Sequence, residues 1–124
     1  MIEVLTGFPG NVAAFACHGH VTKADYETVL MPDVEKKLQQ HEKVSIYYET
    51  APDFEGFDPG AMWDDTKVGF SHYSRWERIA VVTDVDWIKH TMRFAGFLMP
   101  AEVRAFPTTD ADEARGWVAK TATA

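Results

Sequence analysis

The chain has 124 residues, enough for one hydrophobic core and too few for a second independent one. Apolar residues make up 46% of it and charged residues 25%, an ordinary balance for a folded protein. The formal net charge of −7 argues against nucleic acid as a partner, because binding it requires a basic surface that displaces counterions. We expect one domain over residues 1–120 and a disordered tail at residues 121–124.

The cysteine content and the lengths of the apolar runs indicate in which cellular compartment the protein is expected. A single cysteine, Cys17, excludes an internal disulfide and is typical of the reducing cytoplasm. The chain does not open with a basic segment and an apolar stretch, and no run approaches the roughly 20 apolar residues of a membrane-spanning helix. These features predict a cytoplasmic protein without a leader or a membrane anchor.

The first part of the chain predicts a hairpin followed by a helix. Residues 2–5 and 12–17 resemble short strands, and the Gly, Pro and Asn residues between them are typical of a tight antiparallel connection. Thr22 predicts the start of a helix, because its hydroxyl can accept the main-chain N–H of Asp25. Pro32 interrupts the apolar stripe of this helix and predicts a kink, or a restart with the proline in a first turn.

The middle of the chain predicts a strand, a helix and a second strand. Residues 43–50 alternate as a strand does, and the apolar run at residues 79–82 is typical of a strand buried on both faces. Asp58 as cap and Pro59 at the first position predict the start of the helix. Its polar side is expected to include Asp64 and its apolar side to consist of Met62, Trp63, Gly69, Phe70, Tyr73 and Trp76.

The last part of the chain predicts two more helices around a short strand. Asp84 is expected to cap a helix whose inner stripe is Trp87, Ile88, Thr91, Met92, Ala95 and Leu98. Residues 102–106 predict the last strand, and Thr109 and Asp110 begin the final helix. The order β-β-α-β-α-β-α-β-α predicts an α/β fold with right-handed crossovers, a mostly parallel sheet of about five strands, an antiparallel first strand and four or so helices.

Several segments resemble SpoIIAA-like proteins. They are IEVLTGFPGNV at the start, GHVTKAD at 19–25, FEGF at 54–57 before AMWD at 61–64, ERIAVVTD at 77–84 with Trp87, AEVRAF at 101–106 and EARGW at 113–117. The resemblance implies the β-α superhelix of anti-sigma-factor antagonists and STAS domains, which resembles the lipid-binding CRAL-TRIO module. It implies no established activity, and the role attached to it is ligand binding, with peripheral membrane association as an addition.

The resemblance also identifies a difference from the antagonists. In those proteins a loop between a buried strand and the following helix carries an Asp-Ser-Ser-Gly motif whose serine is phosphorylated. The matching segment here is Asp58-Pro59-Gly60-Ala61, which contains no hydroxyl. Because a phosphate needs a Ser, Thr or Tyr oxygen, we expect no phosphosite here and no phosphorylation-driven partner switch.

The aromatic residues of the second and third helices predict a binding site. We expect a small apolar ligand between these helices, in a site lined by Trp63, Tyr73, Trp76, Trp87, Met92 and Phe94. The alternative, and the commoner case for such residues, is ordinary core packing.

A basic face on the third helix extends this hypothesis. Lys89 or Arg93 would meet an anionic head group, and Phe97 follows them at four-residue steps. A face that combines cations with an aromatic ring also suits a weak contact with an anionic membrane surface. The alternative is a solvated helix face, with the ring of Phe97 covered by a neighbour or a second subunit.

Other chemistry has less support in the sequence. His18 and His20 can point the same way, but a closed zinc site takes four ligands and nothing in the spacing supplies the others, so we expect exposed histidines and neither metal nor cofactor. Cys17 is expected to be buried, and no nucleophile elbow or phosphate-binding loop occurs. The leading hypothesis is therefore a non-catalytic binding domain. The rival is a protein-interaction module that acts through its surface, with a homodimer as one form of it.

Overall fold

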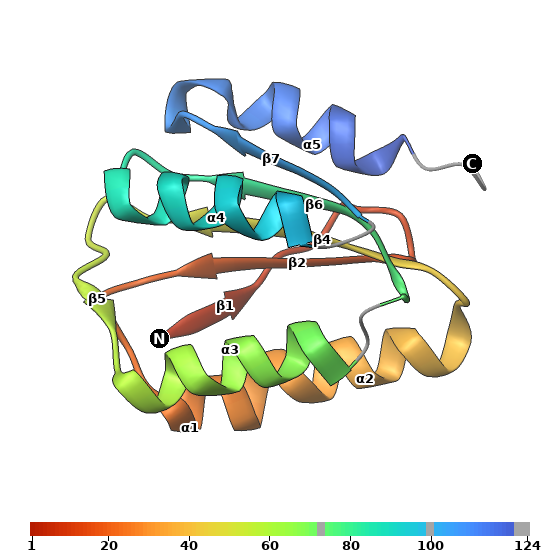
Figure 1. The fold of residues 1–124 in the computed structure, drawn as a ribbon, viewed down its shortest axis with the longest axis horizontal. Coiled ribbons are helices and arrows are strands. Elements are labelled where there is room, and N and C mark those ends of the chain that lie inside the picture. Colours follow the sequence, from red (N-terminus) through yellow and green to blue (C-terminus); the bar gives the residue numbers. More distant parts are fainter. Residues whose placement is uncertain (72–73, 99–100, 121–124) are drawn as a thin grey trace.

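A computed structural model describes residues 1–71, 74–98 and 101–120 and contains one main five-stranded sheet (Figure 1). The strand order is β1-β2-β4-β6-β7, with bounds Ile2–Val4, Val12–Cys17, Val44–Thr50, Trp76–Val82 and Glu102–Phe106. β1 pairs antiparallel with β2, and the other neighbours are parallel. The predicted α/β fold is therefore confirmed, including its antiparallel first strand. The expected tail at 121–124 lies outside the described residues.

Two very short strands form a second, parallel pair that the sequence analysis did not predict. β3 (His20–Val21) pairs with β5 (Gly56–Phe57). Two residues are too few to produce an alternating pattern, so the sequence around them resembles a loop. The pair ties the segment before α3 to the end of β2.

The helices are α1 (Lys23–Asp25), the π-helical η1 (Tyr26–Leu30), α2 (Met31–Gln40), α3 (Pro59–Ser71), α4 (Asp86–Leu98), the 3-10 helix η2 (Thr108–Asp110) and α5 (Ala111–Ala119). Thr22 caps α1 as predicted: its hydroxyl accepts the N–H of Asp25 at 3.1 Å and its own N–H donates to the Asp25 carboxylate at 2.9 Å. Pro32 lies in the first turn of α2, but the predicted restart does not occur, because Leu30 and Met31 keep helical backbone angles and η1 leads directly into α2.

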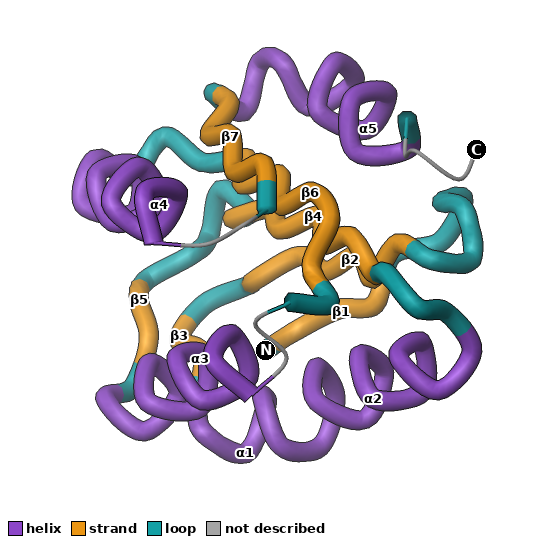
Figure 2. The backbone as a smooth tube through the Cα atoms, turned by 45° about the vertical axis from the view of Figure 1, so that its right-hand side comes forward, coloured by secondary structure: helices purple, strands orange, loops and turns teal. Residues whose placement is uncertain are grey.

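The helices cover the two faces of the sheet unequally (Figure 2). α1, η1, α2, α3 and α4 lie on one face and α5 alone lies on the other. Alternation along β2 fits this arrangement, because Phe15 belongs to the core beneath η1 and α2 whereas Ala14 belongs to the core beneath α5. Right-handed crossovers between successive neighbouring strands require their connecting helices to lie on the same face.

The predicted orientation of α3 is wrong at the start of the helix, whereas the side chains of Phe70 and Tyr73 lie outside those that the structure describes. Asp64 is fully buried, whereas Met62 and Trp63 are exposed. The reason is the close packing of α3 on α1: a Cβ added to Gly60 would lie 3.1 Å from the Lys23 side chain, and Ala61 is fully buried. A helix that approaches its neighbour this closely turns its small residues inward and leaves its large ones outside.

Other expectations need correction. On α4, Trp87 and Thr91 of the predicted inner stripe are exposed, whereas Ile88 is buried as predicted. Trp76 does not belong to the helix before it but begins β6, where it is 2% exposed and pairs with Val44. Asp84 does not cap α4, which begins at Asp86; its carboxylate accepts the N–H and the hydroxyl of Thr108 at 3.1 and 2.6 Å. These bonds fasten the end of β6 to the turn after β7, and they lower the pKa of Asp84 despite some desolvation.

Candidate ligand-binding groove

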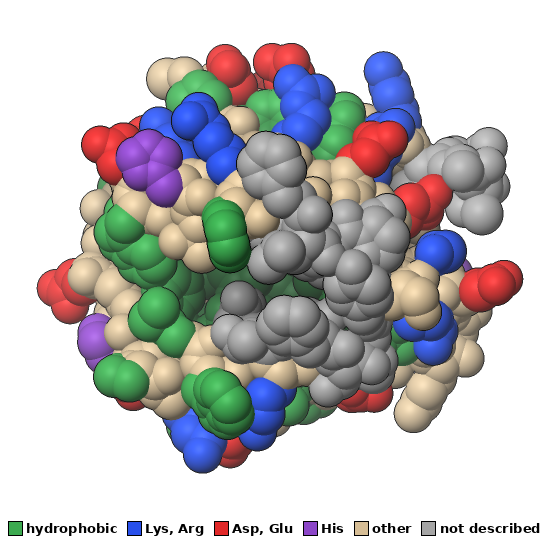
Figure 3. Space-filling view, viewed as in Figure 1, with side chains coloured by type: hydrophobic (Ala, Val, Ile, Leu, Met, Phe, Trp, Pro, Cys, Tyr) green, Lys and Arg blue, Asp and Glu red, His purple; other side chains and the backbone are tan. Residues whose placement is uncertain are grey.

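A hollow with an apolar floor lies between α3 and α4 (Figure 3). It exists because the two helices pack on different partners: α3 contacts α1 and η1, whereas α4 contacts β7. On this face of the sheet Tyr48 of β4 and Ile79 of β6 are only partly buried. We call this feature the α3–α4 groove.

Large apolar side chains are exposed on both helices beside the groove. Among the described residues the large hydrophobic side chains that are exposed are Met1, Val4, Met62, Trp63, Trp87 and Phe94. Four of these six belong to α3 and α4. The most exposed are Trp63, at 62%, and Phe94, at 67%. The two helices therefore present more apolar surface than the core of the domain uses.

An aromatic cluster connects the start of α4 with the segment before α3. The ring of Phe57 meets Trp87 edge-on, with 6.1 Å between centroids, and it also contacts Phe54 at 5.0 Å and Tyr26 at 6.4 Å. These are normal separations for attractive aromatic pairs. We call this cluster the aromatic end of the groove, because it bridges the two elements that form the groove walls.

A polar pair adjoins the aromatic end. The hydroxyls of Tyr26 and Tyr48 form a hydrogen bond, and the ring of Tyr48 packs on Phe15 at 6.2 Å. Tyr26 is buried, whereas Tyr48 is partly exposed. The described residues beside the groove are therefore mainly apolar, with a hydrogen-bonding pair next to its aromatic end, a combination that is common in small-molecule sites.

The structure brings together only some of the predicted lining residues. Trp87 lies at the aromatic end, and Met92 is half-buried on α4. Trp76 is buried at the opposite, amino-terminal end of β6 and cannot line the groove. Tyr73 lies outside the described residues. Sequence analysis missed Phe57, although the spacing FEGF, with two phenylalanines around a glycine, was the available signal.

Lys89 and Arg93, the residues expected to meet an anionic head group, both lie on α4. Lys89 is half-buried and contributes to the lowered pKa of Asp84, while Arg93 is exposed. The side chain of Phe97 is outside those that the structure describes. The expected basic and aromatic face of α4 therefore remains a prediction.

The two histidines after β2 are clamped by carboxylates. Both ring nitrogens of His18 are engaged: Nε2 lies 2.9 Å from the Glu3 carboxylate and Nδ1 lies 3.2 Å from that of Asp53. His20 Nε2 contacts the Asp58 carboxylate. The hydrogen bond to Glu3, followed by that to Asp53, raises the pKa of His18 against some desolvation. Within the described part of the chain no three His, Cys, Asp or Glu residues are grouped to hold a metal ion.

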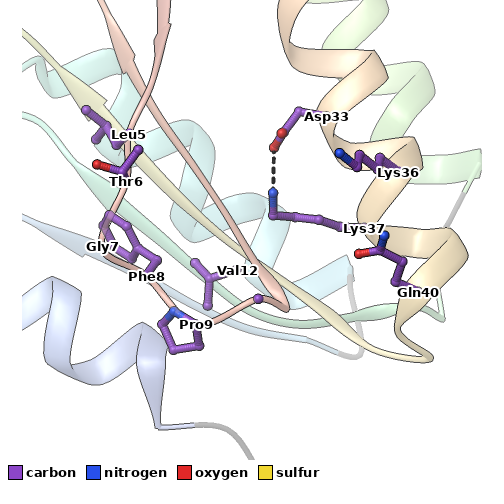
Figure 4. A pocket seen from close by; sticks show the side chains of 11 residues that line it. Leu5, Thr6, Gly7, Phe8, Pro9, Val12, Asp33, Lys36, Lys37 and Gln40 are labelled. Atoms are coloured by element: carbon purple, nitrogen blue, oxygen red, sulfur yellow. Dashed lines mark hydrogen bonds and ion pairs between the residues drawn. The ribbon is translucent and has the colours of Figure 1, made fainter.

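A second depression lies between the β1–β2 loop and α2 (Figure 4). Its volume is about 380 Å³, and its lining includes Phe8, Lys36 and Gln40. Lys37 points toward Asp33 across its edge and forms an ion pair of 3.0 Å with it. The ring of Phe8 packs on Tyr47, 5.0 Å away. Because Lys37, Asp33 and Phe8 already have partners, the depression is a weaker candidate than the α3–α4 groove.

Known proteins resemble the chain in sequence and in fold. The family model described as SpoIIAA-like matches residues 12–119. The chain belongs to the SpoIIAA-like family. It is also similar to a solved structure, the crystal structure of an uncharacterized protein of the DUF3478 family with a SpoIIAA-like fold from Shewanella loihica PV-4. That protein is 25% identical, with a TM-score of 0.73 over 94% of this chain and 93% of the other. No curated protein matches the chain.

The segment Asp58-Pro59-Gly60-Ala61, which is expected to match the phosphorylation motif of the antagonists, leads into α3. Asp58 contacts His20 immediately before α3, and Pro59 is the first residue of that helix. Gly60 abuts Lys23, and Ala61 is fully buried. In this chain the segment therefore serves the docking of α3 on α1. In the described part of this SpoIIAA-like chain, no helix has both the length and the apolar content to cross a membrane.

Proposed function

We propose that this SpoIIAA-like chain is a non-catalytic binding domain that holds a small, largely apolar ligand with an anionic head group in the α3–α4 groove. The observation that carries the proposal is the exposure of Met62, Trp63, Trp87 and Phe94 on the two helices beside the hollow. Covering one such side chain is favourable by about 1.5–3 kcal/mol, so three contacts contribute at most about 9 kcal/mol before the cost of association, and the head group must add to this for tight binding.

The head group is proposed from the charges of α4. The chain carries a net charge of −7, yet Lys89 and Arg93 lie one turn apart on a helix that borders the groove. An anion would be repelled by most of the surface and attracted here. A weak contact with an anionic membrane would use the same side chains, each contributing about 1 kcal/mol.

We propose a binding role without catalysis because Tyr26, Tyr48 and Asp84 already have structural partners. Tyr26 and Tyr48 bond to one another, and the Asp84 carboxylate is engaged by Thr108. The single cysteine, Cys17, cannot form an internal disulfide, which supports the reducing cytoplasm as the place of action.

The proposal can be tested by measuring the binding of a long-chain fatty acid such as oleate. Calorimetry and the intrinsic tryptophan fluorescence both report this binding. Phe94→Ala should weaken binding about 10-fold or more, the equivalent of about 1.4 kcal/mol or more of lost apolar contact. Val4→Ala is the matched control: Val4 is an exposed apolar residue of β1, away from both helices, and its loss should leave the affinity unchanged.

Two results would contradict the ligand proposal. One is the absence of binding across a panel of fatty acids and anionic phospholipids. The other is an equal effect of Phe94→Ala and Val4→Ala. If the purified chain binds no lipid but forms a homodimer or a complex that Phe94→Ala disrupts, the exposed aromatics serve the rival function, a protein-interaction module.

A further inference from the structure

His18 can donate a hydrogen bond to both of its carboxylate neighbours only when its ring is protonated. A neutral imidazole has one N–H donor and one acceptor nitrogen, whereas an ionised carboxylate only accepts. With Glu3 at 2.9 Å from Nε2 and Asp53 at 3.2 Å from Nδ1, a neutral ring would donate to one carboxylate and turn a lone pair toward the other. The imidazolium donates to both. The geometry is therefore selective for the charged form.

The contacts of His18 and His20 fasten one particular segment. Residues 51–58 run from the end of β4 to the start of α3, and Asp53 and Asp58 lie in this segment. The segment is also bonded through its backbone to the strand that carries the histidines: the N–H groups of 51, 55 and 58 donate to the carbonyls of residues 17, 19 and 21 at 2.9, 2.7 and 2.8 Å. Phe54 and Phe57, which belong to the aromatic end of the groove, lie between the two fastened carboxylates.

Several other charged groups lie close to His18. The charged and titratable groups that contact one another in this region are the carboxylates of Glu3, Asp25, Asp53 and Asp58, the rings of His18 and His20, and the α-amino group of Met1. The α-amino group donates to the carbonyls of His18 and His20 and pairs with Asp25 at 3.3 Å. A protonated His18 ring supplies a cation between the Glu3 and Asp53 carboxylates. A neutral ring removes that cation and leaves the two carboxylates beside it without a balancing charge.

We propose that His18 forms, with Glu3 and Asp53, a pH-sensitive clasp that fastens residues 51–58, and with them the aromatic end of the α3–α4 groove, when its ring is protonated and loosens them when its ring is neutral. The consequence for binding rests on the proposed function, whereas the clasp itself does not need a ligand. The raised pKa of His18 sets the direction: stabilisation by the clasp is fully present below the ordinary value of 6.5 and is lost as the pH rises through the higher folded value.

Amide hydrogen exchange of the intact chain between about pH 5.5 and 8.5, corrected for intrinsic rates, tests the clasp without a ligand. Protection of residues 51–58 should fall by about two- to five-fold as the pH rises over this range, the size expected for a partly exposed ion pair, while protection of the central strand β4 stays constant. His18→Gln should abolish the pH dependence. His90→Gln, at an exposed histidine on α4, is the matched control and should retain it.

A second variant keeps the test informative if His18→Gln folds poorly. Asp53→Asn preserves the shape of the carboxylate and removes its charge, so the ring-proton titration of His18 should move to lower pH. The clasp is refuted if protection of residues 51–58 is the same at both ends of the range, or if Asp53→Asn leaves the His18 titration unchanged.

Oleate binding measured over the same pH range separates the two proposals. Affinity that decreases with pH in the wild type, but not in His18→Gln, supports both. Exchange that responds to pH in a chain that binds no oleate supports the clasp and contradicts the proposed function. Binding with pH-independent exchange supports the groove and refutes the clasp.

Discussion

The carboxylate of Asp64 provides a quantitative test of the way α3 packs. Its side chain is 0% exposed, and neither oxygen has a hydrogen-bond partner among the described residues. Its recorded ion pair is with the Nζ of Lys67, 3.5 Å away, and the Lys67 side chain is 51% exposed. A buried anion is thus matched with a cation that remains largely in water.

The two opposing energies differ in size. At an effective dielectric constant of about 20, two charges at this separation attract by about 5 kcal/mol, but solvent around an exposed lysine reduces the net gain to about 0–1 kcal/mol. Removing a carboxylate from water costs several kcal/mol. Asp64→Asn keeps the shape and removes the charge, so it should raise the free energy of unfolding by about 1–3 kcal/mol and Tm by roughly 4–10 °C.

Urea denaturation followed by circular dichroism measures the change, with the slope of the transition checked for constancy. Lys67→Met is the companion variant: it leaves the carboxylate without its cation and should lower the free energy of unfolding by up to about 1 kcal/mol. A loss of more than about 1 kcal/mol in Asp64→Asn would refute the reasoning, because it would mean that the charge is needed in the folded state.

Three further predictions test other parts of the fold. Trp76→Ala should lower the free energy of unfolding by about 3–5 kcal/mol, whereas Trp63→Ala should change it by less than about 0.5 kcal/mol; equal effects in chemical denaturation would contradict the assigned burial of these two residues. Thr22→Ala should cost about 1 kcal/mol in the same assay because it removes the α1 cap, and Thr22→Ser should restore most of it. Asp84→Asn should lower Tm near neutral pH, because the lowered pKa of Asp84 means that its ionised form stabilises the fold above its ordinary value of 3.8. The Tm difference from the wild type should disappear as the pH falls through the lower folded value, and a constant difference in a pH series would exclude this origin.

The fold was predictable because its signals are local or spread over the whole chain. Alternation over residues 43–50 predicted β4, the capping residues around Thr22 predicted the first helix, and the last strand was predicted with the bounds that the structure shows. The order of elements then fixed the mostly parallel sheet. The resemblance to SpoIIAA-like proteins added the family, which the match over residues 12–119 confirms.

The site was less predictable because it depends on contacts between distant residues. The pairs His18–Asp53 and His20–Asp58 join positions 35 and 38 residues apart, and no periodic pattern reports such a pairing. The prediction for the orientation of α3 was wrong for a related reason. Hydrophobicity favours Met62 on the inside, but the distance to α1 is set by Gly60, and that tertiary constraint determines which side of the helix faces the core.

The groove itself follows from the topology. Successive right-handed crossovers place α1, α3 and α4 on one face of the sheet, in the same order as the strands they connect. If α3 lay midway, its large side chains would cover Tyr48 and Ile79. Instead, the small residues at its start let it move against α1, while α4 stays on β7. The space left over the middle strands, and the exposure of Met62 beside it, are therefore two consequences of one packing choice, and a larger residue at position 60 would alter both together.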